Sequence, residues 1–286
     1  MNRHLAALTA PLVLAGCSLA PRTELPAPPV PVSWPVGDAY LVQSEAALPL
    51  VSYRDIFAEP RLQTLVETAL INNRDLRVAA ANVAEARAQA RSTRAAQFPA
   101  IGVGGSVDHS DPSGAKARTD YSASAAISGF ELDLFGKLAN ASEAERNRAL
   151  ATESAARTVR LSLVADLVDA WASYASARDL LAISEDTAQS AHKSVELTRA
   201  RLQGGVAPRT DLRQAEQILA TAEIAVARQK TALAQDENLI RLLVGSEFDK
   251  ALLPTSMAQV TRSIATLPAG MNSTVLLRRP DIIQAE

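Results

Sequence analysis

Residues 136–203 read GKLANASEAERNRALATESAARTVRLSLVADLVDAWASYASARDLLAISEDTAQSAHKSVELTRARLQ, with no proline and no glycine after the first residue. Because proline and glycine are the residues that most often interrupt helices, this segment can form one continuous helix. At about 1.5 Å per residue, such a helix is about 100 Å long. Mostly apolar residues recur at every seventh position and so form one stripe along the helix: Leu167, Tyr174, Leu181, Ala188, Val195 and Leu202. Small side chains lie three residues after the first five, at Ala170, Ala177, Ser184, Ala191 and Thr198.

A second helix follows after a short interruption. Residues 210–244 again contain no proline or glycine. Their stripe also recurs every seventh residue, at Leu212, Leu219, Val226, Leu233 and Ile240. Heptads sustained over this length predict helices packed side by side as a coiled coil. We therefore expect a helical hairpin whose turn consists of Gly204, Gly205, Val206, Ala207, Pro208 and Arg209.

Between residues 100 and 131 the period of the pattern changes from seven to two. Ile101, Val103 and Val107 alternate with small and polar residues, and a second alternation covers 121–128 after a polar run. Period two in two arms predicts a β-hairpin over 100–131. Its apolar and polar faces fit a membrane barrel wall between lipid and a wet lumen. Periodicity alone favours a soluble hairpin with one solvated face, and both interpretations stay open.

Shorter elements flank these segments. A helix is expected over 60–71, with proline in its first turn, and another over 75–97, capped by Asp75 and ended by Pro99. After Gly245 we expect a loop that leads to a new helix start at Pro280. The predicted fold class is therefore mainly α with a small β part, in which long coiled-coil helices accompany one two-stranded hairpin.

The N-terminus predicts export and lipid attachment. A basic start is followed by about 11 apolar residues, which form a signal peptide over 1–16 and are too short to span a membrane. Leu14-Ala15-Gly16-Cys17 matches the bacterial lipobox. We expect Cys17, the only cysteine of the chain, to be acylated and to hold the protein at a membrane. Residues 17–54 are expected to form an extended, proline-rich tether.

Composition and residue spacing argue against nucleic-acid binding, metal binding and catalysis. The chain has 286 residues and a net charge of −2, so no charge excess favours nucleic acid. His4, His109 and His192 are far apart, without metal-ligand spacing. We find no candidate catalytic residue, no metal ligands and no cofactor motif, and we predict that the protein is not an enzyme.

These elements, in this order, resemble the outer-membrane efflux protein family, the TolC-like channels, and within it the NodT-type lipoproteins. The most specific motif, LRRPDI at 277–282 followed by Ala285 and Glu286, is similar to the junction between the two repeats of that family. Residues 130–137 look like its strand-to-helix exit, 60–76 like its first helical segment, and 205–212 like its periplasmic helix turn. The resemblance implies that 55–286 is one channel repeat, with the chain truncated before the second repeat is complete.

The resemblance also implies a function. Three copies of the family's chains form a homotrimer with a transmembrane β-barrel in outer-membrane lipid and a long periplasmic α-barrel extension. This duct passively exports drugs or other small molecules that a periplasmic adaptor (membrane fusion) protein and an inner-membrane pump deliver. By resemblance, the turn 204–209 contacts the adaptor and Asp211 helps to hold the closed tip. A carboxylate at a helix start explains Asp211 equally well.

The sequence is also compatible with two other functions. A periplasmic lipoprotein adaptor and a structural coiled-coil protein both contain helical hairpins. Adaptors flank theirs with β domains rich in glycine and valine, and no such sequence surrounds 136–244. Neither alternative explains a β-hairpin inserted between long helices.

Overall fold

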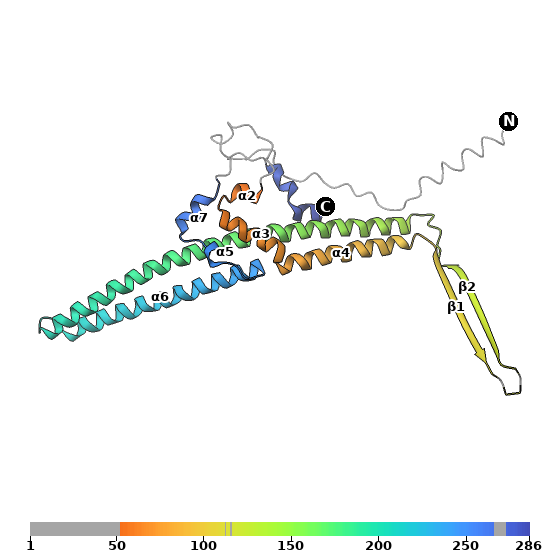
Figure 1. Ribbon diagram of the computed structural model, residues 1–286. Helices are drawn as coiled ribbons and strands as arrows, with labels where there is room; N and C mark the ends of the chain where they lie inside the picture. Colours follow the sequence, from red (N-terminus) through yellow and green to blue (C-terminus); the bar gives the residue numbers. More distant parts are fainter. Residues whose placement is uncertain (1–51, 112, 115, 266–272) are drawn as a thin grey trace. The chain divides into compact units, whose positions relative to one another are not determined.

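The computed structural model describes residues 52–111, 113–114, 116–265 and 273–286. The predicted signal peptide, Cys17 and the tether up to residue 51 lie outside the described residues. The described part is mostly helical and contains one two-stranded antiparallel sheet (Figure 1), so the predicted fold class is confirmed. Its residues group into two compact units. The first unit consists of 80–155 and 283–286, and the second of 52–79, 156–265 and 273–282.

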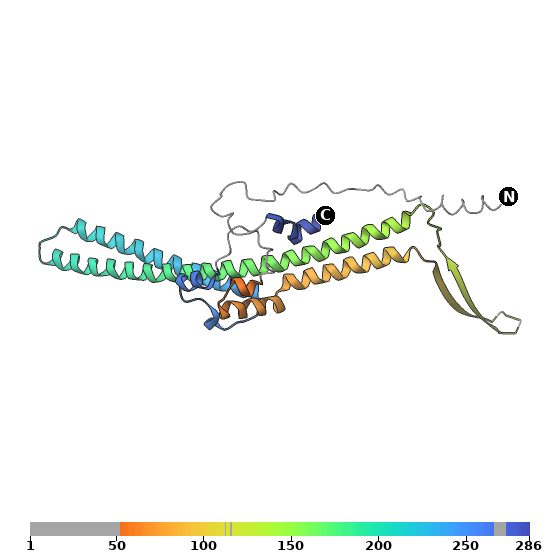
Figure 2. The same ribbon diagram turned by 90° about the horizontal axis from the view of Figure 1, so that it is seen from above.

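The first unit contains the β-hairpin and the helix segments that lead into and out of it. α4 (Arg74–Ala95) leads to β1 (Ala100–Ser110) and β2 (Arg118–Ser128), and α5 (Lys137–Gln203) follows. α4 ends two residues before the predicted end, because residues 96–98 already form shorter turn bonds ahead of Pro99. α4 and the first part of α5 run side by side (Figures 1 and 2), and Arg87 pairs with Glu153 at 2.7 Å.

The start of α5 has a local cause. Gly136 has a positive φ of 74° just before the helix. The carboxylate of Asp133 accepts a hydrogen bond from the N–H of Ala139 at 2.9 Å. This bond satisfies one of the first-turn amides, which have no partner within the helix.

In the second unit α5 and α6 (Arg209–Val244) form an antiparallel helical hairpin (Figures 1 and 2). All the heptad positions from Leu167 to Leu202, and the small residues three positions later, are buried or half-buried. The same holds for the five heptad positions of α6. The stripes recognised from the sequence are therefore the packed seam of this hairpin.

A hydrophobic core lies where the hairpin helices meet the short elements. Trp171 of α5 is fully buried, and its Nε1–H donates a hydrogen bond to the carbonyl of Leu252 at 3.1 Å. Around it pack side chains from α3 (Pro60–Asn72), α6 and the segment after it: Leu62, Leu65, Val66, Ile240, Val244, Leu253 and Val260. The face that α3 buries consists of Leu62, Leu65, Val66 and Ala69.

Two expectations about connecting segments are corrected. Residues 53 and 54, assigned to the tether, belong to α2 (Tyr53–Ile56), which Ser52 and Asp55 stabilise through a capping box. The segment after Gly245, expected to be a loop, contains η2 (Lys250–Leu252), α7 (Met257–Ser263) and η3 (Ser273–Arg278) before α8 (Pro280–Ala285). Such short helices depend on tertiary contacts, which periodicity does not reveal.

α7 illustrates such a contact. The N–H of Met257 in its first turn donates to the Asp179 carboxylate of α5 at 2.9 Å, and Val260 is buried in the core. Among the described residues, none of the helices combines the length and apolar character needed to cross a membrane.

Candidate functional site

The β-hairpin separates apolar and polar side chains onto opposite faces. Its register pairs Ile101 with Ile127, Val103 with Ala125 and Val107 with Tyr121, and directly opposed residues share a face. These side chains have no cover within the described residues, and Ile127 is 72% exposed. Each strand has 11 residues, and a tilted strand needs about 9–11 residues to span a membrane.

The other face of the hairpin is polar and small. Gly104 pairs with Ser124, Ser106 with Ser122, and Asp108 with Asp120. The hydroxyls of Ser106 and Ser122 lie 3.0 Å apart, and Arg118 pairs with Asp120 at 2.7 Å. This face can therefore border water while the first borders an apolar medium.

The turn between α5 and α6 is a tight helix cap. The N–H of Val206 donates to the carbonyl of Arg201 and that of Gly205 to Leu202, both at 3.0 Å. Gly205 has a φ of +73°. This pair of bonds around a left-handed glycine is the Schellman motif, which satisfies the last carbonyls of a helix. Of the six predicted tip residues, all except Ala207 are exposed, and Arg209 is already the first residue of α6.

Asp211 lies in the first turn of α6 and is exposed. Its carboxylate accepts a hydrogen bond from the Thr210 hydroxyl at 3.5 Å. Within the described residues it forms no ion pair. Further along α6, Glu216 pairs with Arg199 of α5 at 3.5 Å and with Arg213 at 2.8 Å.

A polar junction joins the start of α4 to the end of α6. Asn73, only 3% exposed, donates from its amide to the carbonyl of Leu243 at 2.8 Å. Its side-chain oxygen accepts the N–H of Leu76 at 3.1 Å. Gly245 packs so closely that a methyl group there would lie 2.6 Å from the backbone oxygen of Asn72. This asparagine lies between the helices expected over 60–71 and 75–97, but the sequence does not predict its contact with α6.

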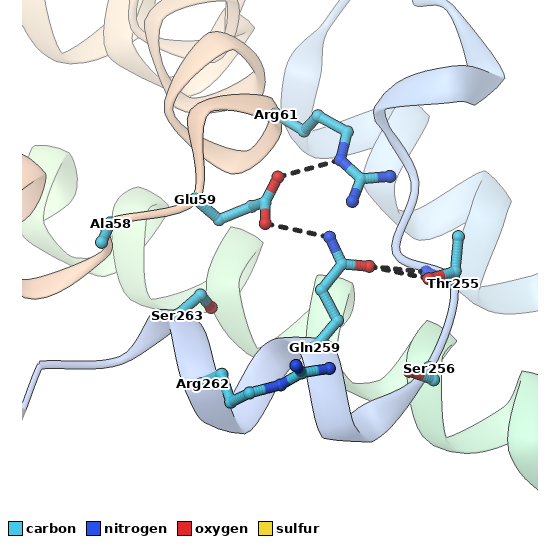
Figure 3. A pocket seen from close by; sticks show the side chains of 8 residues that line it. All are labelled: Ala58, Glu59, Arg61, Thr255, Ser256, Gln259, Arg262 and Ser263. Carbon is cyan, nitrogen blue, oxygen red and sulfur yellow. Dashed lines mark hydrogen bonds and ion pairs between the residues drawn. The ribbon is translucent and has the colours of Figure 1, made fainter.

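A polar cavity of about 500 Å³ lies between the start of α3 and α7 (Figure 3). Glu59 accepts hydrogen bonds from Arg61 Nε and from the Gln259 amide, both at 2.9 Å. Burial acts to raise the pKa of the Glu59 carboxyl, but these bonds and the Arg61 charge outweigh it and hold the pKa below its ordinary value. Sequence reasoning missed this cluster, because residues 59 and 259 belong to segments far apart in the chain.

No group of three or more histidine, cysteine, aspartate or glutamate side chains that could hold a metal ion occurs in the described ranges. The first unit offers a two-faced β-hairpin, and the second offers a helical hairpin with an exposed tip and a polar cavity. Cys17, the predicted lipid attachment point, lies outside the described residues.

Comparison with known proteins gives one consistent result. The family model described as "Outer membrane efflux protein" matches residues 65–246. The chain is 35% identical over 283 residues to the probable efflux pump outer membrane protein TtgC of Pseudomonas putida, covering 96% of this chain and 58% of that protein. It is 36% identical over 276 residues to the cation efflux system protein CusC of Escherichia coli, covering 96% of this chain and 60% of that protein.

Solved structures agree with the sequence relatives. A membrane protein from Pseudomonas aeruginosa superposes with a TM-score of 0.76 at 31% identity, over 94% of this chain and 61% of that one. The chain thus spans about 60% of the length of the relatives that it matches.

Proposed function

The chain belongs to the outer membrane efflux protein family, and we propose that it builds part of the wall of an outer-membrane export channel. Drugs or other small molecules pass through this channel without any chemical step. The relatives named above are components of efflux systems. The family assignment favours a channel over the periplasmic adaptor and the structural coiled-coil protein that the sequence alone left open.

The two-faced β-hairpin is the observation that carries the proposal. Its apolar face, from the Ile101–Ile127 pair to the Val107–Tyr121 pair, lies against lipid, and its serine-rich face lines the lumen. A soluble hairpin would leave its exposed isoleucine, valine and tyrosine side chains in water. Family membership therefore reverses the preference that periodicity alone gave.

The channel is closed by further strands and helices from other copies, as a homotrimer. In the described residues β1 and β2 pair only with each other, and lipid does not tolerate unpaired strand edges. The helices also carry large apolar side chains that remain at least 46% exposed in the described residues, among them Leu180, Ile183, Ile218, Ile224 and Leu242. Exposed apolar side chains of this kind fit contacts with neighbouring helices of a closed wall.

Fractionation and conductance test this proposal together. The native protein should be extracted from outer membranes by detergent as a trimer that dissociates on heating, and it should conduct ions in planar bilayers. A native protein that fractionates with soluble periplasmic proteins, or that never conducts, would contradict the channel.

The helical hairpin extends into the periplasm, and its tip at 204–209 contacts a periplasmic adaptor. The adaptor receives the exported molecules from an inner-membrane pump. Val206 supports this, because it is apolar and 71% exposed at the turn. Val206→Asp should reduce drug resistance and adaptor cross-linking, while the trimer remains intact. Unchanged cross-linking at this position would contradict the contact.

Asp211 helps to hold the tip closed by bonding to another part of the assembled channel. Its exposure and its lack of an ion pair among the described residues leave the carboxylate available for such a bond. Asp211→Ala should therefore raise single-channel conductance and antibiotic entry. Glu223→Ala removes another exposed carboxylate of α6 and serves as the control. Equal behaviour of the two variants would count against gating by Asp211.

Lipid on Cys17 anchors the N-terminus in the outer membrane. The Leu-Ala-Gly-Cys sequence supports this modification. Mass spectrometry of the mature N-terminal peptide should find acyl chains on Cys17, and Cys17→Ser should abolish cleavage after Gly16. An unmodified cysteine in the mature protein would refute the anchor.

A further inference from the structure

The polar cavity between α3 and α7 has features that a channel wall does not require. It is lined by two arginines, one carboxylate and several hydroxyls, and it has a volume of about 500 Å³. Figure 3 shows Arg61 reaching it from α3 and Arg262 from α7, with the Glu59–Gln259 contact between them in this view. Backbone hydrogen bonds hold the segments around the cavity in place. The N–H of Ala58 donates to the carbonyl of Ser263, and the N–H of Ala265 donates to that of Ile56. The N–H of Leu253 donates to the carbonyl of Lys250 and ends η2.

Each of the two guanidinium groups forms its hydrogen bond through Nε. Arg61 uses its Nε to bond to Glu59, and Arg262 uses its Nε to bond to the carbonyl of Ala258 at 3.0 Å. Within the described residues, the terminal nitrogens of both side chains have no hydrogen-bond partner. A guanidinium presents those nitrogens as a planar fork that matches two oxygens of one anion.

The carboxylate in the cavity is already engaged. One oxygen of Glu59 accepts from Arg61 and the other from Gln259. The Gln259 oxygen in turn accepts the N–H and the hydroxyl of Thr255, at 3.0 and 2.9 Å. The two arginines and the one glutamate that line the cavity therefore give it a net charge of one positive unit. Ser256, the N-cap residue of α7 without a side-chain cap bond, adds a hydroxyl donor to the lining.

We propose that this cavity binds an oxyanion, a carboxylate or phosphate group, through the terminal nitrogens of the arginines that line it, Arg61 and Arg262. The anion neutralises the excess charge and satisfies donors that the chain leaves without partners. The site does not depend on the proposed channel function, because it is built entirely from α3, α7 and the residues that flank them.

Titration of the native, detergent-purified protein with two probes tests the proposal. Inorganic phosphate and succinate are added separately at constant ionic strength, with chloride as the reference, and binding is followed by calorimetry. We expect saturable binding of at least one probe, and comparison of the two shows whether phosphate or carboxylate chemistry is preferred. Absence of saturable binding by both anions would overturn the site.

The variant Arg262→Gln separates a site from general electrostatic attraction. It keeps the Glu59–Arg61–Gln259 bonds but removes one fork, so the Kd should rise about tenfold or more. Arg228→Gln removes an exposed arginine of α6 outside the cavity and should leave the Kd unchanged. Equal weakening by both variants would refute the cavity as the binding site. Binding is measured without conductance, so failure of the channel proposal would not affect this result.

Discussion

Single residues position the helix ends in the second unit. Asn73 links the start of α4 to the last turn of α6 by donating to Leu243 and accepting from Leu76. Gly245 ends α6 with a φ of +74° directly against the backbone of Asn72. Because Asn73 is buried and Gly245 packs directly against backbone, these positions tolerate little change in side-chain size.

We predict that Gly245→Ala destabilises the protein more than Gly205→Ala. Both glycines have nearly the same φ, 74° and 73°, so both substitutions carry a similar left-handed strain of about 1–2 kcal/mol. Only at 245 does the new methyl group collide with backbone, whereas nothing lies within 4 Å at 205. The collision should add about 1–3 kcal/mol. Denaturant unfolding followed by circular dichroism measures both; equal losses would contradict the close packing at Gly245.

The Glu237 carboxylate makes the stability of the protein depend on pH. Hydrogen bonds from Lys250 and Arg241 and their charges hold the pKa of Glu237 below its ordinary value, although burial acts in the opposite direction. A depressed pKa in the folded state stabilises the protein above the unfolded value of about 4.3 and loses that contribution as pH falls further. Glu237→Gln should therefore flatten the decline of stability on acidification below that value.

The measurement is the unfolding midpoint of wild type and Glu237→Gln, compared at neutral pH and at acid pH. The gap between the two proteins should narrow as pH falls. A gap that stays constant across the range would show that the ion pairs of Glu237 with Lys250 at 2.8 Å and Arg241 at 3.0 Å do not couple to folding.

Outside the hydrophobic core around Trp171, a narrow seam holds the helices α5 and α6 together. Val195 is 4% exposed, while Leu197 two residues away is 64% exposed. Ion pairs such as Lys230 with Glu185 at 3.4 Å flank the seam. Exposed pairs of this kind contribute little. The seam side chains therefore decide whether the two helices stay paired.

Val195→Asp should open the far half of the helical hairpin, because an unpaired charge in the seam costs at least about 2 kcal/mol. Leu197→Asp places the same charge on the exposed side of α5 and should leave the pairing of α5 with α6 intact. Hydrogen exchange of the amides in 190–225 reports the opening. Protection that falls equally in both variants, or in neither, would refute the seam.

The sequence predicted these long elements well because their signals are local. A period of seven identifies the seam from Leu167 onward, and a period of two identifies the hairpin faces. The partner of Asn73 is 170 residues away and that of Glu59 is 200 residues away. Such contacts depend on how distant segments meet in space, which no local pattern encodes. α7 was missed for the same reason, since Asp179 of α5 caps its first turn.

At the scale of the whole molecule, the chain supplies two strands, long helices and an exposed tip, and it spans about 60% of its relatives. A barrel in lipid requires every strand edge to be paired. A channel wall therefore requires the β-hairpin to join other strands within the outer membrane, with its side chains alternating between lipid and lumen.

Spin labels on adjacent residues of β2 report directly whether the side chains alternate between lipid and lumen. Ala125→Cys carries a label on the apolar face and Ser124→Cys on the polar face of the native protein in outer membranes. Oxygen, which concentrates in lipid, should relax the label at 125 more strongly. A water-soluble nickel chelate should relax the label at 124 more strongly. Two labels equally accessible to the nickel chelate would contradict a hairpin embedded in the membrane.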